Sequence, residues 1–259
     1  MAMEDIDIVY ILGNGSRWAD NELRYSIRSV EKHVKNYRNI ILVGQKPLFL
    51  NDKITFIPAK DTSRNKAKNI LHKVLAAVEC PEVSDNFMFI NDDYFFVKDF
   101  DAQNCPYQYK CNLEQTLEVN KTDYYLYAKT TMDVLKAKGF AYNNFDNHKP
   151  IIFNKQKLRE VVNMYNWDCQ YGYILKSLYC NTLGIEGSHF PDHKVVRPLL
   201  YEAWKEIIAK PEVTVFSVHD RTINLFFKNL MSELFPQPSS YELDLQSAKM
   251  AGVSTQKEI

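Results

Sequence analysis

IDIVYIL, residues 6–12, is the stretch that decides the fold, because a loop and then a change of sequence period follow it. The run is β-branched, aromatic and almost continuously apolar, which is typical of a strand buried on both faces of a sheet. It stops at Gly13-Asn14-Gly15-Ser16. From Asn21 the apolar residues recur at steps of three and four, which predicts an amphipathic helix capped by Asp20 or Asn21.

The same alternation continues along the first hundred residues. Apolar runs at 39–43, 54–57 and 87–90 predict three more buried strands, and Ser63 is expected to cap a helix before the last of them. Because parallel neighbours need crossover connections, this order predicts an α/β fold with a mostly parallel sheet flanked by helices. Ligands bind such sheets beyond the carboxyl ends of the strands, so loops 13–20 and 91–93 are the first candidates for a site.

The second half of the chain is less regular and richer in helices. We expect helices at 130–138, 155–166, 199–209 and 220–234, a late strand at 213–218 and a polar excursion at 104–123. No repeat or linker divides the sequence. We therefore expect one domain over residues 1–242 and a polar, frayed tail over residues 243–259.

The charge balance excludes several classes of protein. The 259 residues include 32 Lys plus Arg and 32 Asp plus Glu, and 46% are hydrophobic. A chain of this composition is not disordered, and its zero net charge argues against wholesale polyanion binding, although a local basic groove stays open. Five cysteines without CxxC spacing indicate reduced intracellular thiols. With an acidic N-terminus and no apolar run of about 20 residues, we expect a cytoplasmic protein, with peripheral attachment to a membrane left open.

Two adjacent carboxylates, Asp92 and Asp93, stand between apolar runs in FINDDYFF, residues 89–96. A buried carboxylate needs a partner, because its desolvation is costly. Mg²⁺ binds one or two carboxylates together with substrate phosphate oxygens, so the pair is a candidate metal site. The alternative is a turn at the end of a strand, where Asn and Asp are favoured.

Histidines and a third aspartate provide further candidates. His148 precedes an apolar run and is either a general base near neutral pH or a surface-loop histidine. Asp220 follows the strand expected at 213–218 and is either a further oxygen ligand or the cap of the next helix. His189 and His193 are four residues apart, but Pro191 between them argues against a metal-binding helix there.

A basic run follows the third expected strand, with five cations within fourteen positions: Lys60, Arg64, Lys66, Lys68 and Lys73. A solvated helix face is the ordinary explanation of such a run, and a cradle for a diphosphate at the start of the helix is the functional alternative. The loop around Asn14 lacks GxGxxG and the Walker lysine pattern. Neither a Rossmann dehydrogenase nor a P-loop NTPase is therefore supported.

Several blocks in order resemble the Stealth family of sugar-phosphate transferases. DIDIVY (5–10) resembles the first block, and NELRYSIRSVEK (21–32), RNIILV (38–43) and FINDDYFF resemble the second. His148-Lys149-Pro150 resembles the third, and residues 216–220 with FPQPSSYE (235–242) resemble the fourth. Three features depart from the family: DTSRNK (61–66) replaces a Pro-Thr-Phe-Asn-Ser-like stretch, His219 replaces an Asn, and the arginine expected after the third-block histidine is not evident.

The resemblance implies a Rossmann-like, GT-A-like fold, with residues 1–100 as the nucleotide-binding half and residues 101–242 as the acceptor-side half. It implies a transferase dependent on Mg²⁺ or Mn²⁺ that moves sugar-1-phosphate from a nucleoside-diphosphate sugar, such as a UDP-sugar, to a glycan or other hydroxyl acceptor in capsule-type polysaccharide biosynthesis. The site residues expected with it are Asp93, His148 and Lys176 for catalysis, Asp92, Asp93 and Asp220 for the metal, and Asn14, Arg24, Arg64 and Lys66 for the donor.

Two other functions stay open. The same residue types suit a glycosyltransferase that moves the sugar alone to a glycan or a modified nucleobase. A non-catalytic module that binds glycans or nucleic acid through the basic helix and aromatic side chains is the second alternative.

Overall fold

The computed structural model describes residues 6–119 and 122–244, so nearly all of the tail expected at 243–259 lies outside the described residues. Its centre is a five-stranded sheet of order β4-β3-β1-β5-β9, formed by β1 (Asp7–Ile11), β3 (Ile40–Gly44), β4 (Thr55–Pro58), β5 (Asn86–Asn91) and β9 (Ile151–Asn154). The first four strands are parallel and β9 is antiparallel to β5. The expected α/β class with a mostly parallel sheet is confirmed.

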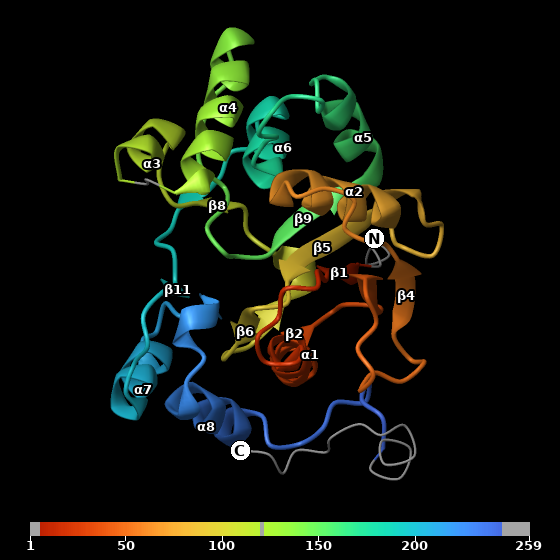
Figure 1. Ribbon diagram of the computed structural model, residues 1–259, viewed down its shortest axis with the longest axis vertical. Helices are drawn as coiled ribbons and strands as arrows, with labels where there is room; N and C mark the ends of the chain where they lie inside the picture. The colour runs from red at the N-terminus through yellow and green to blue at the C-terminus, as the bar shows by residue number, and fades with distance from the viewer. Residues whose placement is uncertain (1–5, 120–121, 245–259) are drawn as a thin grey trace.

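Helices cover both faces of this sheet (Figure 1). Ile8 and Tyr10 of β1 pack in one core cluster with Ile27 of α1 (Asn21–His33). Val9 packs in the opposite cluster with Leu71 of α2 (Lys66–Glu79). Because β1 is buried on both faces, its sequence is almost continuously apolar rather than alternating.

The second half adds helices around the sheet and a small sheet beside it. α3 (Leu113–Val119), α4 (Asp123–Ala137), α5 (Lys155–Asn163) and α6 (Leu175–Thr182) lie on the α2 side (Figure 1). The small sheet has the order β11-β12-β6, from β11 (Lys194–Val195), β12 (Val215–Val218) and β6 (Tyr94–Phe96). It packs with α7 (Tyr201–Ala209) and α8 (Leu225–Leu234) around the buried Trp204 and Phe216.

The remaining elements are short. They are β2 (Val34–Lys35), β7 (Phe100–Asp101), β8 (Gln108–Tyr109), β10 (Ser188–His189), and the 3-10 turns η1 (Ala102–Asn104) and η2 (Asp220–Thr222). Because β6 directly follows the Asp92-Asp93 turn and pairs with β12, the small sheet brings β12 and its neighbour β11 next to the carboxyl end of β5.

Several boundaries differ from those expected. Asn65, not Ser63, caps α2, because its side chain accepts from the Lys68 amide. The excursion at 104–123 contains α3, and α6 was not expected. The helix expected at 220–234 is broken after η2, where the Asn224 side chain caps α8 by accepting from the Phe227 amide. Side-chain capping therefore set boundaries that periodicity did not reveal.

Candidate functional site

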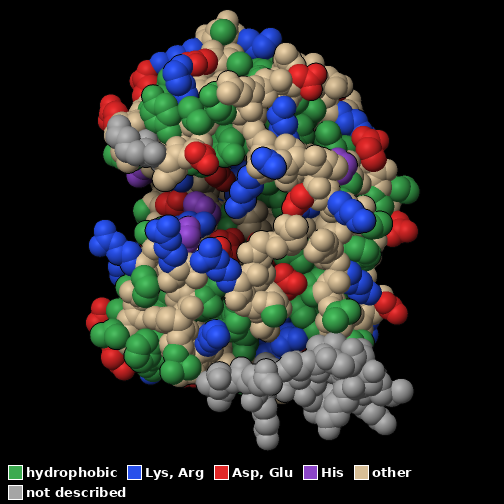
Figure 2. All heavy atoms as spheres, viewed as in Figure 1, with side chains coloured by type: hydrophobic (Ala, Val, Ile, Leu, Met, Phe, Trp, Pro, Cys, Tyr) green, Lys and Arg blue, Asp and Glu red, His purple; other side chains and the backbone are tan. Residues whose placement is uncertain are grey.

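The carboxyl ends of β1 and β5 define the candidate site. Taken in chain order, the strands of the main sheet follow the order 3-2-1-4-5, so the direction of winding reverses between β1 and β5. Open α/β sheets bind ligands in the crevice at such a switch point. Figure 2 shows a hollow near the centre of the face, with acidic side chains deep inside it and Lys, Arg and His side chains around it.

Asp92 and Asp93 form the turn between β5 and β6. Asp93 Oδ1 is buried and has no hydrogen-bond partner in the part of the chain that the structure describes, while Oδ2 lies 3.6 Å from Lys194 Nζ. Burial, followed by the charges of Asp93 and Glu22, raises the pKa of Asp92 to about 7, and the charge of Lys66 opposes this rise. A carboxylate pair with an unpartnered buried oxygen fits a divalent cation that also binds a substrate phosphate.

His148 lies across the site in the loop before β9, with a left-handed φ of 49°. Its Nδ1 is 2.8 Å from Asp192 Oδ2, and its Nε2 is 3.2 Å from Lys194 Nζ. A carboxylate on Nδ1 holds the proton there, so the neutral ring carries its lone pair on Nε2. His148 is therefore fixed with its basic nitrogen toward Lys194, which in turn neighbours Asp93.

Asp192 is a candidate site residue that the sequence did not predict. Burial acts to raise its pKa, but the hydrogen bond and charge of His148 and the charge of Lys110 outweigh burial and lower the pKa below 3.8. Lys110 Nζ donates to Asp192 Oδ2 at 3.1 Å. The only sequence signal was one carboxylate in a proline-containing loop, between the two histidines considered for zinc.

Glu22, in the first turn of α1, adds a buried acid that was also not predicted. It is 4% exposed, and its Oε2 accepts from Ser16 Oγ at 2.8 Å. Burial raises the pKa of Glu22 against the effect of its hydrogen bonds, and the charge of Asp220 adds to the rise. Glu22 thus links the first loop electrostatically to both Asp92 and Asp220.

The expected metal site of Asp92, Asp93 and Asp220 is not assembled. Within residues 6–119 and 122–244, no three or more His, Cys, Asp or Glu side chains are placed to hold a metal ion. Asp220 is exposed at the start of η2, a turn capped by the His219 side chain, which accepts from the Arg221 amide. The protein ligands that fit a cation are therefore Asp92 and Asp93.

Lys176 and Arg24, both expected at the site, are buried. Lys176 Nζ donates to Tyr94 Oη at 3.0 Å and to Lys149 O at 2.9 Å. It therefore holds the backbone of Lys149, the residue after His148. Arg24 lies over the Phe49 ring, with Nε 3.4 Å from Glu242 Oε2. Both side chains are engaged with the protein interior instead of being presented to a donor.

The other residues expected to bind the donor stay near the edge of the site. Asn14 and Arg64 are exposed in their loops. Lys66, the first residue of α2, acts electrostatically on Asp92. Lys73 of the same basic run is buried and pairs with Asp61 at 2.5 Å. The run is therefore not a uniform cradle, because its members face both solvent and core.

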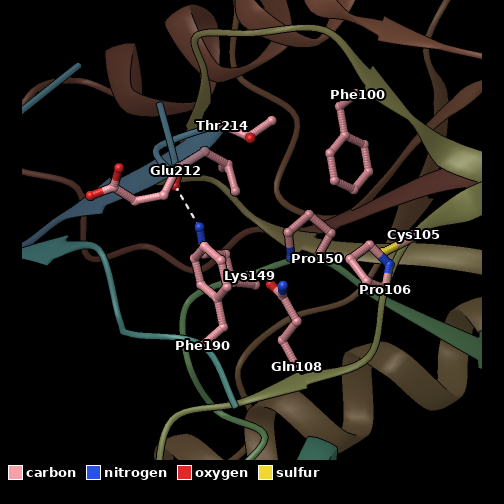
Figure 3. A pocket seen from close by; sticks show the side chains of 10 residues that line it. Phe100, Cys105, Pro106, Gln108, Lys149, Pro150, Phe190, Glu212 and Thr214 are labelled. Carbon is pink, nitrogen blue, oxygen red and sulfur yellow. Dashed lines mark hydrogen bonds between the residues drawn. The ribbon is translucent and has the colours of Figure 1, made fainter. Parts of the chain in front are cut away.

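A separate cavity of about 230 Å³ lies beside Lys149 (Figure 3). Lys149 Nζ donates to Val215 O and to His193 Nδ1, each at 3.1 Å, and burial lowers its pKa to about 8. Phe190 and Pro150 provide apolar walls (Figure 3). The adjacent residues His148 and Lys149 therefore lie in different surroundings: His148 contacts Asp192 and Lys194 in the candidate site, and Lys149 lines this cavity.

The fold and this geometry define an α/β protein with a mixed acidic and basic ligand site at the switch point of a doubly wound sheet. Residues 17–113 match the family model described as Stealth protein CR2, conserved region 2. The resemblance to the Stealth family expected from the sequence is confirmed over these residues. The matched residues include Asp92 and Asp93 but neither His148 nor Lys194.

Curated relatives match about a third of the chain. Human N-acetylglucosamine-1-phosphotransferase subunits alpha/beta are 34% identical over an alignment of 102 residues, which covers 33% of this chain and 8% of that protein. A capsular polysaccharide phosphotransferase of Actinobacillus pleuropneumoniae is 30% identical over an alignment of 99 residues, which covers 32% of this chain and 26% of that protein. The chain thus matches about a quarter or less of the length of these relatives.

Solved structures align over more of the chain at lower identity. The galactosyltransferase LgtC in complex with donor and acceptor sugar analogs is 14% identical, with a TM-score of 0.47 over 95% of this chain and 100% of that one. An active-site mutant of LgtC gives a TM-score of 0.49 over 93% and 99%, again at 14% identity. None of the helices in the described ranges has the length and apolar character needed to cross a membrane.

Proposed function

We propose that the chain is a metal-dependent transferase that moves sugar-1-phosphate from a nucleoside-diphosphate sugar to an acceptor hydroxyl, with residues 1–100 holding the donor and residues 101–242 the acceptor. The observation that carries the proposal is the line of groups from Asp192 through His148 and Lys194 to Asp93. It joins an oriented base, a cation and a carboxylate with an unpartnered oxygen. The names of the two phosphotransferases above support transfer of a sugar phosphate rather than a sugar.

The reaction follows from the roles that these groups can take. The acceptor oxygen attacks the β-phosphorus of the donor, and the bond from that phosphorus to the α–β bridging oxygen breaks. A nucleoside monophosphate leaves, and the acceptor proton passes to Nε2 of His148. Asp192 stabilises the imidazolium that forms, because its carboxylate accepts the hydrogen bond from Nδ1–H of His148.

Asp92 and Asp93 are the residues that would hold Mg²⁺ or Mn²⁺. When bound, the cation supplies charge neutralisation for the diphosphate and the leaving phosphate. Lys66 lies close enough to act electrostatically on Asp92 and supplies further positive charge from the start of α2. The donor site therefore combines two carboxylates with protein cations, as a metal-bound diphosphate requires.

The test is turnover with identified products. The chain is incubated with UDP-sugars, Mg²⁺ or Mn²⁺ and candidate glycan acceptors, and the released nucleotide is identified. We expect UMP, and we expect EDTA and Asp93→Ala to abolish its release. Full turnover by Asp93→Ala would place the site elsewhere, and ligand affinity without metal or turnover would instead identify a binding module.

A further inference from the structure

Lys194 is a cation at the centre of the site that neither the sequence nor the family block pointed to. It lies on β11, whose pairing with β12 fixes its backbone. Its Nζ is 3.2 Å from His148 Nε2 and 3.6 Å from Asp93 Oδ2. Its backbone amide donates to Asp192 Oδ1 at 3.2 Å, so the carboxylate that orients His148 also positions Lys194.

Lys194 covers the nitrogen that the reaction needs. Because Asp192 holds the proton on Nδ1 of His148, Nε2 carries the lone pair, and the Lys194 ammonium donates into it. A lone pair engaged in this way cannot accept a proton from an incoming hydroxyl. The contacts with Asp192 and Lys194 thus hold His148 in the correct tautomer with Nε2 blocked.

Within the described residues, the Lys194 ammonium donates one hydrogen bond, to His148 Nε2, and forms one longer ion pair, with Asp93. The 3.6 Å separation from Asp93 is too long for a strong hydrogen bond, and an ammonium has three protons to donate. The neighbouring lysines have closer anionic or carbonyl partners: Lys110 donates to Asp192, Lys149 to Val215 O, and Lys176 to Lys149 O. Lys194 is therefore the lysine in this group best placed to exchange its present contacts for an anionic ligand.

We propose that Lys194 binds the phosphoryl group that is transferred and that this contact draws its ammonium off His148 Nε2. The subsite lies between Lys194 Nζ and His148 Nε2, beside the Asp93 carboxylate that would hold the cation, and its ligand is a tetrahedral phosphate oxyanion. Donor binding then frees the base, so the acceptor hydroxyl is activated only when a phosphoryl group is present. This inference rests on the proposed function.

The experiment follows His148 directly. In the full chain labelled with ¹⁵N-histidine, the Nε2 resonance of His148 is assigned with His148→Gln and recorded during titration with Mg²⁺ and inorganic pyrophosphate. We expect pyrophosphate to move this resonance as Lys194 leaves. In Lys194→Met the resonance should lie at the released position before any addition, and pyrophosphate should bind roughly tenfold or more weakly. Lys194→Arg should keep most of the affinity, because it keeps the charge.

Lys46→Met is the matched control, since the Lys46 side chain is 25% exposed against 23% for Lys194 and also pairs with an aspartate, Asp52. It should behave as the wild type in both measurements. Wild-type affinity and an unchanged His148 resonance in a folded Lys194→Met or Lys194→Gln variant would overturn the inference alone. If the wild type binds neither pyrophosphate nor UDP with Mg²⁺ or Mn²⁺, the proposed function fails and this inference falls with it.

Discussion

At the scale of single residues, the proposed chemistry depends on the hydrogen bond by which Asp192 orients His148. Asp192 binds His148 and Lys110 together, and Lys194 follows it by two residues. His148 was predicted from its sequence block, but Asp192 and Lys194 were not, because their contacts with His148 span more than forty positions of the chain. Local pattern carries no information about such pairs.

Asp192→Asn should destabilise the fold in a pH-dependent way. The pKa of Asp192 is lowered in the folded chain, so its contribution to the free energy of unfolding is present above pH 4 and is lost as pH falls further, where the unfolded chain takes up the proton first. We expect a loss of about 1–3 kcal/mol at pH 7. In urea titrations, the difference in the free energy of unfolding between the variant and the wild type should become smaller below pH 4.

Asp133→Asn is the control, because Asp133 pairs with Lys129 on the exposed surface of α4. Its urea midpoint should equal that of wild type. An Asp192→Asn variant that is as stable as wild type at pH 7 would show that Asp192 does not hold the His148 loop.

His148→Ala should remove base catalysis and leave the fold intact. We expect the turnover number to fall roughly 10²- to 10⁴-fold, because that is the usual contribution of a positioned base. Circular dichroism and the donor dissociation constant should change little, since His148 is partly exposed and makes its contacts at the site. Unchanged steady-state kinetics in this variant would show that His148 is a surface-loop histidine and not the base.

At the scale of elements, the strands and helices of the first ninety residues could be predicted because each has a clear period and ends at a loop. The second half could be predicted less well. α6 is buried on most sides and so lacks an amphipathic stripe, and a single capping side chain, Asn224, divides η2 from α8. Asp220 stays a predicted ligand: it lies at the start of the capped turn η2, and the structure does not group it with Asp92 and Asp93 in a set of three ligands within the described residues.

Gly44 ends β3 where this strand meets β1, and it is a sharp test of their pairing. Its φ is 136°, and an added Cβ would overlap the carbonyl oxygen of Leu12. Backbone cannot yield as a flexible side chain can, so Gly44→Ala should lower the free energy of unfolding by more than about 3 kcal/mol.

Gly139→Ala provides the comparison for that substitution. Gly139 also has a positive φ, 74°, but an added Cβ would meet no atom within 4 Å. It should cost about 1 kcal/mol, the usual strain of a left-handed alanine. Equal denaturation midpoints for the two variants would contradict the close packing of β3 against β1.

At the scale of the whole molecule, the segment 235–242 is bonded to α1. Arg28 donates to both oxygens of Glu242, at 2.6 and 2.7 Å, and Arg24 lies beside them. The residues that resemble Stealth most specifically, NELRYSIRSVEK and FPQPSSYE, therefore contact one another. The sequence could not reveal this, because the two blocks are separated by more than 200 positions.

Glu242→Gln should loosen this attachment. The Arg28 and Glu242 side chains are 2% and 8% exposed, so the variant removes the negative charge from a buried ion pair, and we expect the free energy of unfolding to fall by about 3–5 kcal/mol. Glu79→Gln breaks an exposed pair with Arg159 and should leave the melting temperature unchanged. If the two variants melted alike, Glu242 would not stabilise the fold.

The central claim is that the groups from Asp192 to Asp93 together catalyse the transfer of a phosphoryl group. A donor labelled at its β-phosphate tests this claim most directly. The full chain is given a UDP-sugar that carries ³²P in the β-phosphate, with Mg²⁺ and a glycan acceptor, and the label is located after turnover. We predict label in the glycan, with UMP released, and no transfer after EDTA or with Asp93→Ala. Label that remains in UDP while the sugar reaches the glycan would contradict the account and identify a glycosyltransferase.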